Sequence, residues 1–140
     1  MKHTLLTLVL IALSIFTFAQ NKKDTSEIKI DSIQNEKTYL KVEEMPYFPG
    51  GEKALKKYIS KNLSYPKQEK ESKVSGKVYV SFIIEKDGSI TDIKVLRGLK
   101  YYFDKEAIRL VRNMPNWIPG IQSGEKAKVQ YVLPIEFSND

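Results

Sequence analysis

The chain contains no cysteine, and its single histidine is His3. Without cysteine there are no disulfides, thiolate nucleophiles or cysteine metal ligands. If the N-terminus is removed, no histidine remains for Ser-His-Asp or Cys-His catalysis or for the common zinc sites. The conceivable polar catalysts that remain have ordinary roles in turns, on strand faces or in solvent; they are Glu43, Glu44, Asp87, Asp92, Tyr101 and Tyr102. We therefore expect no enzymatic activity, no cofactor and no metal site.

The chain has no apolar run long enough for an ordinary membrane span. Its apolar run Leu5–Phe18 has 14 residues without a charge, whereas a spanning helix needs about 20. Lys2 precedes this run. Thr17 and Ala19 are small residues three positions and one position before the expected cleavage site, and the chain then becomes polar. This pattern is typical of a secretory signal peptide, here residues 1–19, and predicts a periplasmic or secreted protein. The alternative is an uncleaved inner-membrane anchor with the rest of the chain facing the periplasm.

The chain also lacks a concentrated basic patch, although its formal net charge is +6 from 23 Lys+Arg and 17 Asp+Glu. The basic residues alternate with acidic ones, as in Lys67-Gln68-Glu69-Lys70-Glu71. A mixed pattern of this kind indicates a solvated surface rather than a nucleic-acid footprint. We expect no nucleic-acid partner.

Residues 20–45 are polar and have few aliphatic side chains, which predicts a flexible linker or arm. Met45–Gly51 then combines two prolines and a glycine pair with apolar residues, so it should lie extended on a surface. Residues 46–138 carry the periodic patterns of a folded domain. We expect one helix at Glu52–Asn62, where Leu55, Tyr58 and Ile59 share a face.

The strongest pattern is a β-hairpin over Gly76–Leu96. Apolar residues alternate in its first strand, and Asp87-Gly88 then forms the turn. Ile90 is out of phase with the rest of the second strand, which indicates either a bulge near Thr91-Asp92 or a role for Ile90 in covering the turn.

A second helix should follow, with Asp104 as its N-cap and its end near Met114. Trp117 lies in a Pro-rich loop, where it either plugs the end of the sheet or forms a ligand platform. The third strand is expected at Lys126–Phe137.

These elements assemble into an α+β domain with a three-stranded antiparallel sheet in the order 2-1-3 and two helices on one face. Pro134 favours an edge position for the third strand, because proline has no N–H for a central ladder. A free edge can accept a strand from another chain. The alternative is that Pro134 and nearby lysines merely protect the edge from pairing.

Several motifs recur in an order and spacing that resemble the TonB C-terminal domain family over residues 39–137. They are Met45-Pro46-Tyr47-Phe48-Pro49-Gly50-Gly51, Tyr65-Pro66, Gly76-Lys77-Val78, Phe82–Ile90, Val95-Leu96-Arg97-Gly98, Phe103–Ala107, Met114–Gly120 and Leu133–Phe137. Each motif is weak by itself, but together they are specific.

The resemblance implies a small α+β domain in a protein of energy-dependent transmembrane transport. In that family the domain pairs with a short TonB box of an outer-membrane receptor. The resemblance assigns the pairing strand to Val129–Phe137 and gives Tyr65-Pro66 as a second receptor-facing segment. The protein-binding residues expected here are therefore Tyr65, Pro66, Lys128, Val129, Gln130, Tyr131, Val132 and Leu133.

The chain departs from a full transducer at its N-terminal end. Such a transducer has a membrane helix that couples to ExbB and ExbD, followed by a long spacer across the periplasm. Here the apolar segment has the pattern of a cleaved signal peptide, and residues 20–45 form only a short spacer. Coupling to the motor is expected only with an uncleaved anchor. The alternative function is a stand-alone envelope module for protein interaction or dimerisation.

Overall fold

The computed structural model describes residues 36–139. The predicted signal peptide and residues 20–35 of the predicted arm lie outside the described residues. The elements are β1 (Thr38–Tyr39), α2 (Glu52–Asn62), the short 3₁₀ helix η3 (Lys67–Glu69), β2 (Gly76–Ile84), β3 (Ile90–Arg97), α3 (Tyr101–Arg112), β4 (Gly120–Gln122) and β5 (Glu125–Phe137). No helix among these residues is long and apolar enough to cross a membrane.

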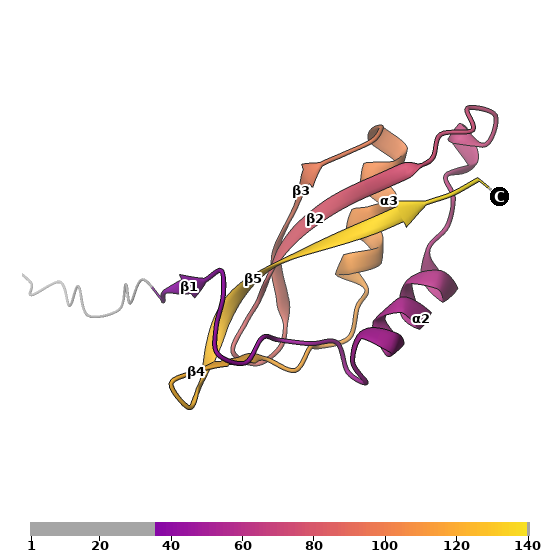
Figure 1. The fold of residues 1–140 in the computed structure, drawn as a ribbon. Helices are drawn as coiled ribbons and strands as arrows, with labels where there is room; N and C mark the ends of the chain where they lie inside the picture. The colour runs from indigo at the N-terminus through magenta and orange to yellow at the C-terminus, as the bar shows by residue number, and fades with distance from the viewer. Residues whose placement is uncertain (1–35, 140) are drawn as a thin grey trace, which may run out of the picture. The chain divides into compact units, whose positions relative to one another are not determined.

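The three long strands form the centre of the sheet, with β2 between β3 and β5 and antiparallel to both (Figure 1). The β2–β5 ladder runs without interruption from Gly76 opposite Phe137 to Ile84 opposite Val129. These strands correspond to the predicted order 2-1-3, which is confirmed. β2 is central because both of its faces carry apolar side chains.

The sheet has five strands rather than the expected three. β1 pairs parallel with β5, and β4 pairs antiparallel with the start of β5. The expectation of a purely antiparallel three-stranded sheet is therefore wrong in this detail. Strands of two or three residues are too short to show a period in sequence, and pairing with a long neighbour is what orders them.

The hairpin contains the predicted bulge. The β2–β3 register shifts between the pairs of Ser81 and Ile83, and Asp92 has a left-handed φ of 50° at this point. At the turn, the Asp87 carboxylate accepts hydrogen bonds from the Ser89 N–H at 2.9 Å and the Ser89 hydroxyl at 2.6 Å. Gly88, at φ 87°, supplies the conformation that a side chain would disfavour.

The two helices differ in how well their bounds were predicted. α2 has the predicted bounds, whereas α3 begins at Tyr101, before the expected N-cap Asp104. The Asp104 carboxylate lies inside the first turn and accepts a hydrogen bond from the Leu99 N–H at 2.9 Å. It therefore stabilises the N-terminus of α3 from within the helix. The sequence alone does not distinguish an aspartate in this position from one at the N-cap.

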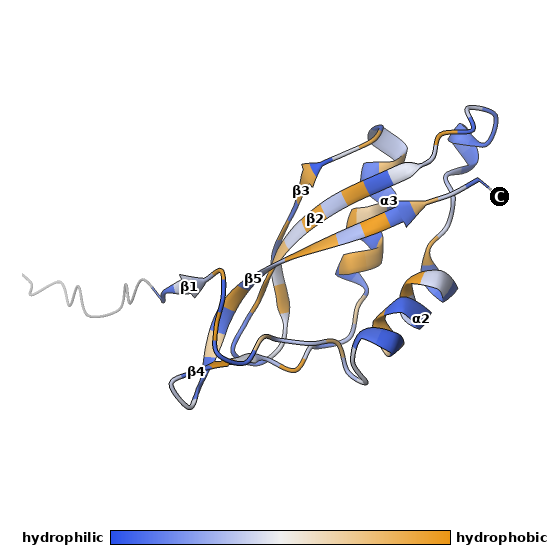
Figure 2. Cartoon of the chain, in the orientation of Figure 1, coloured by the Kyte–Doolittle hydropathy of each residue, from blue (hydrophilic) through white to orange (hydrophobic). Residues whose placement is uncertain are grey.

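Both helices pack on the same face of the sheet, as predicted. A single core joins Leu55 of α2 and the buried side of α3 to the apolar faces of β2 and β5. Figure 2 shows mostly hydrophilic residues along α2, in keeping with a helix that buries only one narrow side. In α3 the buried residues are Phe103, Ala107, Leu110 and Val111, whereas Ile108 and Met114 are only partly buried.

Residues 36–45 belong to the compact unit, which begins at Glu36 rather than at the predicted boundary with Pro46. Val42 packs with Ala127 and Val129 in a second small core, with Tyr39 against it. The Glu44 backbone then pairs with Ile121. These contacts are between residues far apart in sequence, so the polar composition of the segment did not reveal them.

Candidate functional site

β5 has an open edge over most of its length, on the opposite side of the sheet from the edge strand β3. Among residues 36–139, β5 is paired on both edges only at its beginning, and beyond Val129 its ladder is with β2 alone. The outer edge along residues 130–137 therefore presents backbone groups without a strand partner. We call this segment the open β5 edge.

The chain's own β1 occupies the outer edge just before this segment. Thr38 lies opposite Lys128, and Tyr39 lies opposite Val129. Two of the eight expected binding residues are thus already paired on that edge in this structure. An ion pair between Glu36 and Lys86 at 2.8 Å fixes the residues that lead into β1.

The side chains of the open β5 edge alternate between two environments. Leu133 and Ile135 face the helices and are buried, and Tyr131 on the same face is partly buried. On the other face, Gln130 donates a hydrogen bond to the Ser81 hydroxyl at 3.0 Å, and Val132 is 43% exposed. The edge therefore presents an apolar layer toward α2 and a mixed layer toward solvent.

A groove of about 310 Å³ runs between this edge and α2, and we call it the α2–β5 groove. Its walls come from three segments: Pro46, Tyr47 and Phe48; Glu52, Leu55, Lys56 and Ile59 of α2; and Trp117, Tyr131, Leu133 and Pro134. Burial raises the pKa of Tyr131, and the Glu52 carboxylate raises it further. The sequence predicted the strand but not the groove, although an apolar Tyr47-Phe48 pair between prolines was a signal of a covered surface.

Trp117 forms the centre of the aromatic packing beneath this groove. Its ring contacts Phe48, Phe82 and Tyr131 in edge-on arrangements with centroid distances of 5.9, 5.5 and 4.9 Å. The side chain is 2% exposed, and its Nε1 donor has no hydrogen-bond partner among the described residues. Trp117 therefore packs in the core. This agrees with the first of its two expected roles, filling the end of the sheet, and not with an open ligand platform.

Tyr65 and Pro66 lie elsewhere, in the loop after α2. The Tyr65 hydroxyl donates a hydrogen bond to the Val74 carbonyl at 2.8 Å, and its ring packs edge-on against Phe103 at 5.2 Å. Pro66 is buried at the start of η3. Both residues thus hold the loop in place, and they expose little surface of their own.

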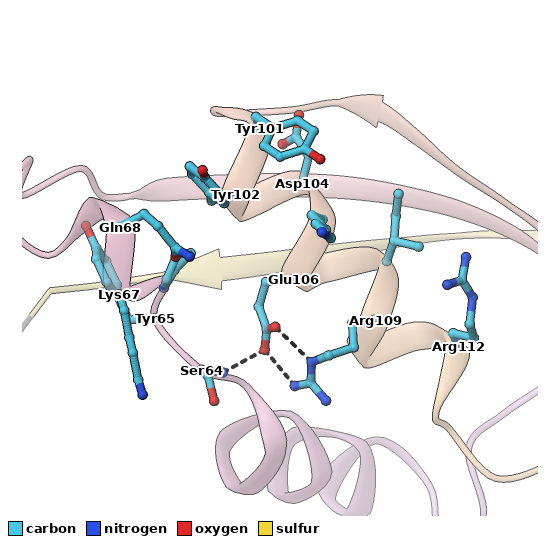
Figure 3. A pocket seen from close by; sticks show the side chains of 13 residues that line it. Ser64, Tyr65, Lys67, Gln68, Tyr101, Tyr102, Asp104, Glu106, Arg109 and Arg112 are labelled. Carbon is cyan, nitrogen blue, oxygen red and sulfur yellow. Dashed lines mark hydrogen bonds and ion pairs between the residues drawn. The ribbon is translucent and has the colours of Figure 1, made fainter.

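These two residues line a second, wider pocket of about 780 Å³ between the loop at residues 64–68 and the exposed side of α3 (Figure 3). At its base the Glu106 carboxylate accepts hydrogen bonds from Arg109 and, at 2.9 Å, from the Ser64 N–H. Arg109 also donates to the Asn62 carbonyl at 2.8 Å. This network fastens the end of α2 to α3.

The two regions are joined through the core and share no lining residue. Phe103 packs against Tyr65 and also against Phe137, with centroid distances of 5.2 and 5.1 Å. The structure therefore places the eight expected residues in two groups: six on β5 and two at the α3 pocket. No group of three or more potential ligands that could hold a metal occurs within residues 36–139.

Comparison with known proteins finds relatives of this chain. The chain is similar to "Protein TonB" of Campylobacter coli, with 30% identity over 84 residues that cover 59% of this chain and 36% of that protein. The chain thus spans about a third of the length of that relative.

Two solution structures of a Helicobacter pylori TonB-CTD also match. One is 28% identical, covers 63% of this chain and 92% of that one, and has a TM-score of 0.48. The other is 29% identical, covers 60% and 76%, and has a TM-score of 0.45. The sequence model described as "Gram-negative bacterial TonB protein C-terminal" matches residues 61–138, more than half of the chain. The chain therefore belongs to the TonB C-terminal family.

Proposed function

We propose that this protein is a periplasmic TonB-domain module that binds an outer-membrane, TonB-dependent receptor by adding the receptor's TonB-box strand to the open β5 edge. The observation that supports this most directly is that residues 130–137 of a long strand in a TonB C-terminal domain have no partner on their outer edge within residues 36–139. The backbone groups of such an edge supply hydrogen bonds to an extended peptide. In this role the protein takes part in energy-dependent transport across the outer membrane.

Pro134 makes the proposed pairing specific in its register. Proline is tolerated in a sheet where its missing N–H would have pointed away from the partner strand. Because the direction of the backbone groups alternates along a strand, Gln130 and Val132 point their N–H groups to the same outer side as the ring nitrogen of Pro134. The bonded footprint of an added strand is thus centred on Gln130 and Val132, with only a carbonyl offered at Pro134.

A pull-down with an immobilised TonB-box peptide tests this function. Val132→Pro removes an outward N–H donor from the edge and is expected to abolish capture, while Val132→Thr retains the donor and should capture normally. If the proline variant unfolds, N-methylation of alternate residues of the peptide makes the same test on the other strand. Equal capture by Val132→Pro and wild type, or by methylated and plain peptides, would contradict strand addition.

A second function, self-association through the same edge, is favoured by the chemistry of an open edge, which pairs with any suitable strand. In that case the protein is an envelope interaction module without a transport role. Sedimentation of the wild type and of Val132→Pro distinguishes the two. A concentration-dependent dimer that the proline abolishes supports self-association, and a monomer that binds the peptide supports the receptor. Coupling to ExbB and ExbD belongs to the proposal only if residues 1–19 stay attached as an anchor.

A further inference from the structure

We propose that the α2–β5 groove receives apolar side chains from every second residue of the strand that pairs with the open β5 edge. The groove thereby selects partner segments in which large apolar residues alternate with small or polar ones. This inference rests on the proposed strand addition. It adds a rule for which strands are accepted, which backbone pairing alone does not provide.

The first step is the position of the groove relative to the edge. An added strand would lie about 4.8 Å from β5, with its side chains alternating between the two faces of the sheet. Side chains on the helix side continue the layer formed by Tyr131 and Leu133, and these two residues are themselves walls of the groove. Every second side chain of the added strand therefore enters the space between β5 and α2.

The second step is the chemistry of the walls. Leu55 and Leu133 are buried, and Ile59 on the neighbouring turn of α2 is partly buried. The charged wall residues, Glu52 and Lys56, pair with each other at 3.2 Å and have side chains that are 80% and 75% exposed, so they lie at the rim. A charged side chain placed deeper would lose its hydration without a partner. An apolar side chain would displace water from an apolar surface.

The third step is the contrast with the other face. Side chains that point away from the helices would lie next to Gln130, Val132 and Glu136, on a part of the sheet that is open and partly polar. This surface tolerates polar residues, since they remain hydrated there. One face of the partner strand therefore favours apolar side chains, which enter the groove, and the other face accepts polar ones, which stay in solvent.

The size of the groove limits its occupant. A volume of about 310 Å³ lies at the lower end of the roughly 300–1,000 Å³ that small-molecule pockets occupy. Tyr47, which is 52% exposed, forms an outer wall of the groove. The groove therefore has room for one or two side chains of an added strand.

The test uses the full chain and short peptides of alternating leucine and threonine. Replacing all leucines by serine is expected to weaken binding by about ten- to a hundredfold, because each buried leucine contributes substantially through its apolar area. Replacing all threonines by serine should change affinity less than about twofold, since those side chains stay in solvent. Equal sensitivity of both sets would overturn the inference.

Variants of the protein make the matched test. Ile59→Ser alters the groove and should weaken binding of the leucine peptide, whereas Lys57→Ser on the same helix lies outside the lining residues and should not. If Ile59→Ser folds poorly, Tyr47→Ser is the second variant, since Tyr47 is exposed and pairs with Ile118 through its backbone. Unchanged affinity in a folded groove variant would also overturn the inference.

Amide chemical shifts separate the two proposals. Shifts along Gln130–Glu136 with no preference for leucine would leave strand addition standing and overturn only the groove's role. The absence of any shift along this segment would overturn strand addition itself. Loss of self-association in Tyr47→Ser without any peptide binding would assign the groove to a second copy of this chain and would likewise overturn the inference.

Discussion

Tyr39 of β1 lies opposite Val129, and Ile84 of β2 lies opposite the same residue on the other side. Val129 is thus the last residue of β5 with strand partners on both edges. β1 covers the outer edge at Lys128 and Val129, and the open β5 edge begins at the next residue. The position of β1 therefore sets where an added strand can start.

Substitution of Tyr39 tests this limit. The Tyr39 ring packs on the small core of Val42, Ala127 and Val129, and Lys37 lies over it at 4.8 Å from the ring centre. Tyr39→Ser should release β1, because a two-residue strand makes few backbone bonds and the exposed ion pair between Glu36 and Lys86 contributes little. We expect peptide-induced amide shifts to extend to Lys128 and Val129 in the variant. Leu40→Ser is the control, since Leu40 is 75% exposed, and it should keep the wild-type footprint.

Gly88 is predicted to be intolerant of any side chain. A Cβ atom there would lie 2.0 Å from the Trp117 carbonyl oxygen, and φ is +87°. Gly88→Ala should cost about 2–5 kcal/mol in unfolding free energy, from about 1–2 for the left-handed backbone and about 1–3 for overpacking. Gly124→Ala has a similar φ of +76° but open space, so it should lose only the backbone part. Equal losses in denaturant unfolding would show that the Trp117 contact does not matter.

Trp117 is expected to stabilise the fold through its aromatic contacts and not through its indole N–H. Trp117→Ala should cost about 3–5 kcal/mol, as is usual for large core aromatics. Trp117→Phe should cost clearly less, because it retains an aromatic ring and removes a buried donor that has no acceptor among the described residues. Thermal and denaturant unfolding measure both values. A phenylalanine variant as unstable as the alanine variant would mean that the N–H does make an important bond.

The Glu106 network predicts a dependence of stability on pH. Burial is the largest single influence on the pKa of Glu106 and raises it, but the hydrogen bonds from Arg109 and from the Ser64 N–H, with the charge of Arg109, together hold the pKa below its ordinary value of 4.5. A carboxylate with a lowered pKa in the folded state adds stability above the unfolded value. That stability is lost as the pH falls through the folded value.

Glu106→Gln should therefore be less stable than the wild type at neutral pH. The difference should be about 1 kcal/mol or less, because the Arg109 side chain is 46% exposed. It should shrink as the pH falls from about 4.5, the ordinary value for this carboxyl. Glu52→Gln is the matched control, since its ion pair with Lys56 is exposed on both sides, and it should change stability very little at any pH. A difference for Glu106→Gln that stays constant down to acid pH would contradict this account.

The sequence predicted those features that repeat along the chain. The alternation in β2 and β5, the Asp87-Gly88 turn and the stripe of α2 are local patterns, and the structure confirms each of them. Pro134 predicted an edge position for β5, because its missing N–H constrains a single strand, and β5 has this position beyond Val129, where β1 no longer pairs with it. The family motifs supplied the assignment of the domain, which the family match confirms.

Features that depend on contacts between distant segments were not predictable in this way. β1 is ordered by Lys128 and Val129, about ninety residues further along the chain, so the segment looked like part of an arm. The α2–β5 groove needs walls from three separate segments. Tyr65 belongs to the Tyr65-Pro66 motif, but only the structure shows that its hydroxyl donates a hydrogen bond to the Val74 carbonyl. The binding roles of the eight residues remain predictions.

The measurement that tests strand addition most directly is an amide NMR titration of the full chain with a TonB-box peptide. The account predicts saturable shifts along Gln130–Glu136, slowed hydrogen exchange at Gln130 and Val132, and nuclear Overhauser contacts between the peptide backbone and the outer edge of β5. Shifts confined to the α3 pocket around Tyr65 and Arg109, with the β5 amides unchanged, would contradict it.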